Sequence, residues 1–190
     1  MPNRKLELLR DINPEWNDLE GLREHHRSKY MNRKRMLVRK FVLMDAFFPE
    51  YEKGGFKVLD VSCASGAMLE ILRYFKNEIF GTDVGYFAFM KSQHIPHEYM
   101  NCTIFPYPLS DKSYDLITCL GSFTFYRPFP ALWQRVLDEF ARISRKTIFI
   151  TINEGPNFDK FSYLLNEWRH KEWKLVMYKK YYYKWERINE

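Results

Sequence analysis

The chain has 190 residues, enough for one domain of ordinary size and too few for two large ones. Apolar residues make up 46% and charged residues 28%, so the chain can bury a core, and the composition excludes disordered and collagen-like proteins. Three cysteines without CxxC spacing or paired histidines nearby indicate neither a disulfide framework nor a metal site. No stretch approaches the roughly 18 apolar residues of a membrane span, and the N-terminus lacks a signal-peptide pattern, so we expect a soluble, cytoplasmic protein.

The net charge of +6 is concentrated near the N-terminus. Residues 27–40 contain no acid, and their basic members are Arg27, Lys29, Arg33, Lys34, Arg35, Arg39 and Lys40. Such a patch is usually a solvated face, but it can also attract an anionic ligand.

The same region predicts an amphipathic helix. Its apolar residues recur every three or four positions, at Leu37, Phe41, Met44 and Phe48. The helix should begin near residue 32 and end at Pro49. We therefore expect an N-terminal helical segment, 1–50, packed on a core, 51–190, within a single domain.

Predicted strands and helices alternate through the core. The strands are expected at 57–61, 78–81, 97–100, 114–119 and 147–152, and the helices at 67–75, 87–93, 132–143 and 158–169. Parallel strands need such crossovers, so the pattern predicts an α/β fold with a doubly wound, mostly parallel sheet. The last two strand-like runs, 173–178 and 181–188, are too close for a crossover, so we expect an antiparallel C-terminal hairpin at the sheet edge.

Three signals fall beyond the carboxyl ends of these strands, where ligands bind in open α/β sheets. The run 60–66, DVSCASG, is a turn of small residues that lets a ligand approach the backbone. Asp83 follows about twenty residues later, at the end of the second strand, where a carboxylate can accept hydrogen bonds from ribose hydroxyls. The loop 101–108 can enclose a flat base between apolar side chains. Together the signals indicate a cofactor that contains a nucleoside.

A nicotinamide-binding Rossmann domain is the close alternative. Its fingerprint requires glycines at three positions that hold Ser62, Ala64 and Ala67 in this chain. Asp60, at the end of the first strand, favours a cationic cofactor, because a carboxylate attracts an ammonium or sulfonium group and repels a pyrophosphate.

Four runs follow one another in the order of a known set of motifs: VLDVSCASG at 58–66, GTD at 81–83, FPYP at 105–108 and SYDLITC at 113–119. Through them the chain resembles class I S-adenosylmethionine-dependent methyltransferases of the type 11 kind, over roughly residues 56–152. The resemblance implies a Rossmann-like methyltransferase fold, S-adenosylmethionine as cofactor and an enzyme that transfers a methyl group.

The resemblance also implies which residues bind the cofactor. They are Asp60, Ser62, Cys63, Ala64, Gly66, Asp83, Val84, Asn101, Cys102 and Leu120. Asp60 and the turn would lie against the methionine part and Asp83 would bind ribose. Asn101 and Cys102 would meet adenine, with the Asn101 amide oxygen accepting a hydrogen bond from the exocyclic amine.

The turn departs from the family's usual glycines at two positions, where Ser62 and Ala64 stand. Because a positive φ at either residue would cost on the order of 1 kcal/mol, we expect ordinary backbone angles at both. Cys63 is expected to fill the turn rather than to act as a nucleophile.

Methyl transfer is an in-line displacement, so positioning and exclusion of water suffice and no catalytic base is required. If the acceptor is a hydroxyl, the base candidates are the five histidines, His25, His26, His94, His97 and His170. His25 and His26 lead, because they precede the basic helix in a segment that commonly forms a lid in this family. The expected substrate contacts, which follow the fourth strand, are Gly121, Ser122, Phe123 and Tyr126.

Three functions stay open at this point. The first is methylation of a small metabolite, an anionic one if the basic helix attracts it. The second is methylation of RNA, because aromatic and basic residues interleave at 168–187. An edge hairpin with aromatic residues inward and lysines outward explains that tail without nucleic acid. The third is a non-catalytic binding or scaffolding module that retains the fold.

Overall fold

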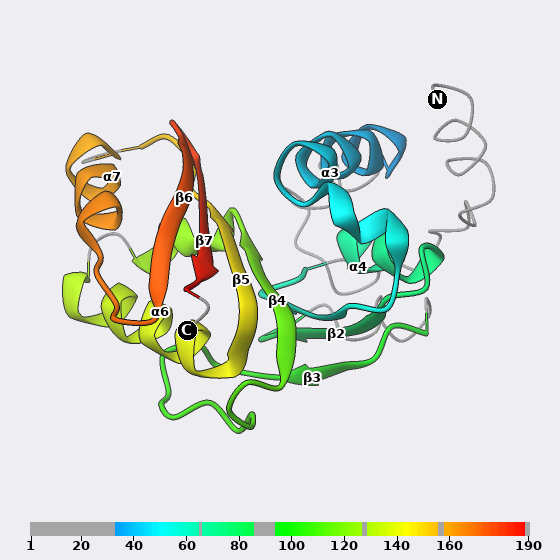
Figure 1. Ribbon diagram of the computed structural model, residues 1–190, viewed down its shortest axis with the longest axis horizontal. Helices are drawn as coiled ribbons and strands as arrows, with labels where there is room; N and C mark the ends of the chain where they lie inside the picture. Colours follow the sequence, from blue (N-terminus) through cyan, green and yellow to red (C-terminus); the bar gives the residue numbers. More distant parts are fainter. Residues whose placement is uncertain (1–32, 65, 86–93, 127–128, 156–157, 189–190) are drawn as a thin grey trace.

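The computed structural model describes residues 33–64, 66–85, 94–126, 129–155 and 158–188. Seven strands form one sheet in the order β3-β2-β1-β4-β5-β7-β6 (Figure 1). They are β1 (Lys57–Val61), β2 (Glu78–Asp83), β3 (His97–Tyr99), β4 (Tyr114–Leu120), β5 (Ser144–Thr151), β6 (Trp173–Lys179) and β7 (Tyr182–Arg187). The first five pair in parallel, and β7 runs antiparallel to both β5 and β6. The predicted mostly parallel sheet with a C-terminal hairpin is confirmed.

Helices cover both faces of this sheet, as predicted for a doubly wound fold (Figure 1). They are α3 (Arg33–Phe47), α4 (Ala67–Tyr74), α6 (Pro130–Ile143) and α7 (Phe158–Glu167), with the short 3-10 helices η1 (Pro49–Lys53) and η2 (Ser122–Tyr126). The predicted helix at 87–93 lies outside the described residues. Among the residues that are described, no helix is both long and apolar enough to traverse a bilayer.

Side chains alternate between two cores along the central strands, because successive residues point to opposite faces of a sheet. In β1, Val58 packs into the core beneath α3 and α4, whereas Leu59 packs into the core beneath α6 and α7. Both side chains are fully buried. Burial on both faces explains why β1 and β4 read as nearly continuous apolar runs in the sequence.

The helix α3 is held on the sheet by the apolar face that its sequence predicts. Leu37, Phe41 and Met44 are each at most 3% exposed. At the end of the helix, the Phe47 ring stacks on Phe149 of β5 with the ring centroids 4.7 Å apart. The basic helix is thereby fixed over the middle strands of the sheet.

The C-terminal hairpin confirms the expected orientation for most of its side chains. Trp173, Tyr183 and Trp185 are buried, whereas Lys174 is exposed. Tyr178 and Lys184 are exceptions. Tyr178, expected to point inward, is 49% exposed, whereas only 8% of Lys184 is exposed and its Nζ lies 2.7 Å from Glu186 Oε1. The outward position predicted for Lys184 is wrong, because the register sets it beside Phe149, on the face of the sheet that α3 and α4 cover.

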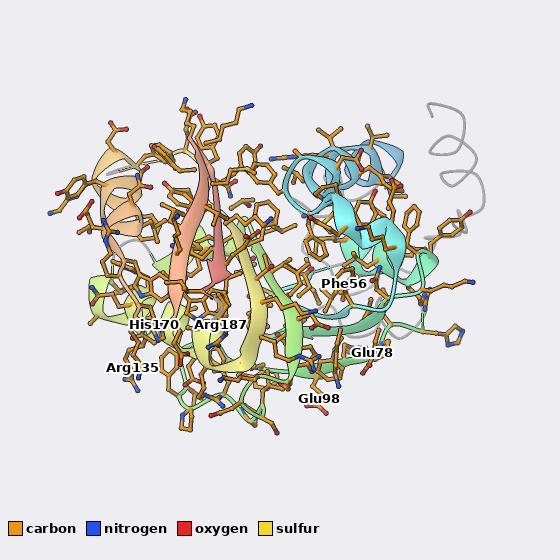
Figure 2. All side chains as sticks on the ribbon, viewed as in Figure 1. Phe56, Glu78, Glu98, Arg135, His170 and Arg187 are labelled. Carbon is orange, nitrogen blue, oxygen red and sulfur yellow. The ribbon has the colours of Figure 1, made fainter. Side chains whose placement is uncertain are left out.

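A single arginine joins this hairpin to the end of α6. Arg187, labelled in Figure 2, donates hydrogen bonds of 2.7 Å from Nη2 to the carbonyl oxygens of Ala141 and Ser144. It also pairs with Glu172. A cation at a helix C-terminus satisfies carbonyls that have no partner within the helix and interacts favourably with the helix dipole.

Candidate functional site

The turn between β1 and α4 is the centre of the candidate site. Its alternate residues Ser62, Ala64 and Gly66 have φ values of 58°, 49° and 67°. All three are left-handed, so the ordinary backbone angles predicted for Ser62 and Ala64 are wrong. The prediction considered only the backbone strain at each residue by itself. In the structure, hydrogen bonds to the neighbouring strand impose the left-handed conformation on the whole turn.

Those hydrogen bonds connect the turn to the end of β2. The Cys63 amide donates to the Thr82 carbonyl at 3.0 Å, and the Ala64 amide donates to Asp83 Oδ2 at 2.9 Å. Within the turn, the Gly66 amide donates to the Cys63 carbonyl at 2.9 Å. Ser62 and Ala64 remain partly exposed, so their backbone is accessible to a ligand.

Asp83 joins two loops through one carboxylate. Besides the Ala64 amide, it accepts the Gly85 amide on Oδ1 at 2.9 Å. Burial raises the pKa of this carboxyl, and backbone hydrogen bonds, Ala64's first, act against the rise. An ionised carboxylate offers roughly four acceptor positions, so directions remain for a ligand hydroxyl. The neighbouring Val84 is 63% exposed and presents an apolar surface beside the carboxylate.

Asp60 places a second carboxylate at the end of β1. The side chain is buried, and Thr118, its register partner on β4, donates a hydrogen bond of 2.7 Å to Oδ1. Burial raises the pKa of Asp60 to about 6, while Lys40 of α3 and the Thr118 hydrogen bond oppose the rise. At neutral pH the group is therefore ionised in a site with little water, which suits a cationic ligand.

The loops after β4 and β5 complete the same edge of the sheet. Gly121, with φ 88°, lies beside Asn153, whose Nδ2 donates to the Gly121 carbonyl at 3.3 Å. The Asn153 amide donates to Thr124 Oγ1 at 2.7 Å. Ser122 Oγ donates to the Ser62 carbonyl at 3.4 Å, which connects the β4 loop to the turn. Leu120 precedes this loop and packs partly buried against the core beneath α3 and α4.

Cys63 occupies the space between the turn and β2. A Cβ added to Gly81 would lie 2.7 Å from Cys63 Sγ and 2.8 Å from Leu69 Cδ1, so any side chain at position 81 would force these two side chains to shift. Cys63 is buried, and burial raises the pKa of its thiol well above the ordinary value. A neutral, buried thiol agrees with a turn-filling role and not with a nucleophile.

Two expectations for individual side chains need correction. Phe123, expected to contact substrate, is fully buried and stacks on Phe161 with ring centroids 6.1 Å apart. The Asn101 amide oxygen already accepts the Thr103 amide at 3.0 Å and the Thr103 hydroxyl at 2.7 Å. It therefore has no free direction for the adenine amine, and the Asn101 amide nitrogen is the group left for a ligand.

Two of the remaining predicted residues lie within the described part of the chain. Cys102 is buried beside Asn101, so only its backbone can face a ligand. Tyr126 is the last residue of η2. His25 and His26 lie outside the described residues.

Sequence reasoning missed three members of the site: Lys40, Thr118 and Asn153. Thr118 acquires its role only from the register that sets it opposite Asp60. Lys40 was recognised as basic, but nothing in the sequence links it to Asp60. Asn153 follows the predicted fifth strand, so its place at the carboxyl end of a parallel strand was an available signal.

Solved structures share this fold at low sequence identity. The magnesium protoporphyrin IX methyltransferase ChlM from Synechocystis PCC 6803, with bound S-adenosylmethionine, has a TM-score of 0.58 and 12% identity, covering 97% of this chain and 91% of that one. DesVI from Streptomyces venezuelae has a TM-score of 0.56 and 13% identity, covering 70% and 57%. A methyltransferase from Archaeoglobus fulgidus has a TM-score of 0.55 and 18% identity, covering 73% and 62%. The chain thus spans less than two thirds of the length of the last two proteins. A search of the curated proteins finds no match.

The fold is the Rossmann-like architecture that these methyltransferases share. Residues 59–150, just under half of the chain, match a family model described as a methyltransferase domain.

The left-handed turn predicts that Ala64→Gly stabilises the protein. Glycine removes the strain of a non-glycine residue at φ 49°, and its greater freedom in the unfolded chain offsets part of the gain, leaving about 0.5–1 kcal/mol. Urea denaturation measures the change. Ala67→Gly, the same exchange at a buried position of α4, should destabilise the protein. Destabilisation by Ala64→Gly would show that the turn is unstrained.

The buried Asp60 carboxyl predicts a pH-dependent effect of Asp60→Asn. A folded-state pKa of about 6 against 3.8 for the unfolded chain means that stability is lost as the pH rises from about 4 to about 6. Asparagine does not titrate, so the variant should be more stable at pH 7.5, by roughly 3 kcal/mol at most. The advantage should disappear near pH 4.

Denaturation at both pH values, with Glu98→Gln as control, tests this prediction. Glu98 is an exposed carboxylate on β3, labelled in Figure 2, and its replacement should change stability little at either pH. Equal stability of Asp60→Asn and the parent at pH 7.5 would mean that Lys40 and Thr118 fully compensate the buried charge.

Proposed function

We propose that this protein transfers a methyl group from S-adenosylmethionine to a small, anionic metabolite. The observation that carries the proposal is the left-handed turn at Ser62, Ala64 and Gly66, hydrogen-bonded to the Asp83 carboxylate. It brings a partly exposed backbone and a carboxylate from neighbouring strands to one edge of the sheet, which is the arrangement that a nucleoside cofactor requires.

The residues present fit S-adenosylmethionine along its length. Asp60 supplies negative charge near the turn, where the cationic methionine end would lie. The remaining acceptor directions of Asp83 suit the ribose hydroxyls. Exposed Val84 gives an apolar wall for adenine, and the Asn101 amide nitrogen can donate to adenine N1.

The bound cofactor supplies an activated methyl group, so the chain has to hold the acceptor and exclude water. Gly121, Ser122 and Asn153 lie at the edge of the sheet from which an acceptor would approach. The Ser122–Ser62 hydrogen bond holds that loop against the cofactor turn. The helix α3 belongs to the N-terminal segment that we propose as a lid, and its Arg39 is exposed while Lys40 is partly exposed. These cations favour an anionic acceptor.

The aromatic tail gives less support to an RNA substrate. Trp168, Trp173, Tyr183 and Trp185 are each at most 8% exposed. A base can stack only on a ring face that it can reach, so these four aromatic residues offer no platform for single-stranded RNA.

Calorimetric titration with S-adenosylmethionine tests the cofactor site. We expect Asp83→Ala to weaken binding by roughly 100-fold or more, because it removes a charged hydrogen-bonding group and releases the turn. Val84→Asp should weaken it by about 10-fold, because the apolar wall is lost without disturbing a buried residue. Val176→Asp, an exchange at an exposed valine on the distant edge strand β6, is the matched control and should bind like the parent. Absence of binding by the parent would leave only the scaffolding function.

Transfer of isotope-labelled methyl groups into a cell extract tests the substrate class. We expect the label in small molecules that bind an anion exchanger, with none in the purified RNA fraction. Label in RNA would favour the nucleic-acid proposal over the metabolite proposal. Binding of RNA by the protein should then weaken steeply as salt rises, because phosphate contacts release counterions.

A further inference from the structure

The loop of residues 101–113 connects β3 to β4 and contains Asn101, so it forms the adenine side of the proposed cofactor site. Most of its polar residues are exposed, but Tyr107 is only 2% exposed. The loop has no helix or strand of its own. Its shape therefore depends on contacts with other elements, and the structure shows those contacts on α6.

Two charged residues of α6 hold both polar groups of the Tyr107 backbone. The Tyr107 amide donates to Glu139 Oε2 at 2.9 Å, and its carbonyl accepts Arg142 Nη2 at 3.1 Å. Glu139 and Arg142 also bind each other, with Arg142 Nη2 donating to Glu139 Oε2 at 2.7 Å. We name these two residues the α6 clamp. The ion pair lowers the pKa of Glu139 despite partial burial, so the clamp is charged at neutral pH.

The clamp holds the loop at further points. Arg142 Nη1 donates to the Leu109 carbonyl at 2.8 Å and to Asp111 Oδ1 at 2.5 Å. Two turns before Arg142 on α6, Arg135, labelled in Figure 2, lies over the Phe105 ring at 4.4 Å from its centroid. The planar guanidinium of Arg142 thus serves several acceptors at once, which a lysine cannot do.

Tyr107 transmits this constraint to the cofactor side of the loop. Its ring is buried against Phe105, with centroids 5.2 Å apart, and its hydroxyl donates to the Cys102 carbonyl at 3.0 Å. On the other side, the Asn101 amide oxygen is fixed by Thr103. The peptide after Cys102 is held from both directions, so the direction of the Asn101 amide nitrogen depends on Tyr107.

We infer that Tyr107, held by Glu139 and Arg142, is a positioning residue that sets the selectivity of this enzyme for the adenine base without touching the cofactor. The inference rests on the proposed function, because it requires that Asn101 faces adenine. Only a correctly directed amide nitrogen can donate to adenine N1, and a donor that is misaligned by a loose loop loses most of that bond.

The test compares binding of S-adenosylhomocysteine with binding of S-inosylhomocysteine. In the inosyl compound N1 carries a hydrogen and cannot accept a bond, so the Asn101 amide nitrogen directed at N1 meets a donor, and the acceptor C6 carbonyl lies at a different position. The parent should therefore prefer the adenosyl compound, and Asn101→Ala should remove the preference. Tyr107→Phe deletes only the hydroxyl that binds Cys102. We expect it to weaken adenosyl binding by about 3- to 10-fold and to leave inosyl binding nearly unchanged.

Tyr183→Phe is the matched control. Tyr183 is also fully buried, and its hydroxyl lies 2.6 Å from Ser162 Oγ on α7, away from the loop. It should lose stability like Tyr107→Phe but keep the parent's ratio of adenosyl to inosyl affinity. Arg142→Lys, which cannot span the acceptors of the guanidinium, should lower that ratio as Tyr107→Phe does.

The outcomes separate the two proposals. If the parent does not bind S-adenosylhomocysteine, the proposed function fails and the inference fails with it. If the parent binds with the adenosyl preference and Tyr107→Phe leaves the ratio unchanged, the proposed function stands and the positioning role of Tyr107 is overturned. Equal weakening of both compounds by Tyr107→Phe would likewise overturn it, because that result indicates only a general loss of folded structure.

Discussion

The hydrogen bond between the Ala64 amide and the Asp83 carboxylate is the constraint on which the candidate site depends. A left-handed residue other than glycine costs about 1–2 kcal/mol, and this turn contains two of them, Ser62 and Ala64. A hydrogen bond to an ionised group contributes roughly as much as one such residue costs. The conformation persists because β2 presents an acceptor at the one place where the turn needs it. The same carboxylate fixes the Gly85 amide, so one side chain orders the ends of two strands.

Asp60 differs from Asp83, because its carboxylate lowers the stability of the folded protein while it serves the candidate site. Burial of this carboxylate destabilises the folded state above its pKa, and Thr118 and Lys40 only partly offset the cost. A neutral residue there would give a more stable protein with a weaker attraction for a cation. Lys40 is carried by α3, which the stacking of Phe47 on Phe149 holds against the sheet. An apolar contact between α3 and β5 therefore determines part of the electrostatic field of the site.

The sequence predicted the architecture well because its signals are local and periodic. Alternating strands and helices required crossovers, and the spacing of Leu37, Phe41 and Met44 identified the buried face of α3. The small-residue turn and Asp83 were recognised for the same reason, since strand ends meet at one edge of a parallel sheet.

Two of the errors concern residues whose environment is set by distant parts of the chain. Phe123 looked like a loop residue near substrate, but α7 covers it through Phe161. Lys184 looked like an outward residue, but the register sets it beside Phe149, on the face of the sheet that α3 and α4 cover. Both outcomes depend on tertiary packing, which propensity and periodicity do not encode. The Asn101 error is local, because its oxygen accepts hydrogen bonds from Thr103, two residues further on.

The packing of Gly81 against Cys63 has a consequence for how this turn can change over time. A Cβ at position 81 would overlap the sulfur atom, so the two positions share one fixed volume. A larger residue at 81 becomes tolerable only after position 63 has shrunk to glycine or alanine and the Leu69 side chain has shifted. Substitutions at these two sites should therefore arise as a compensating pair, in that order, rather than independently.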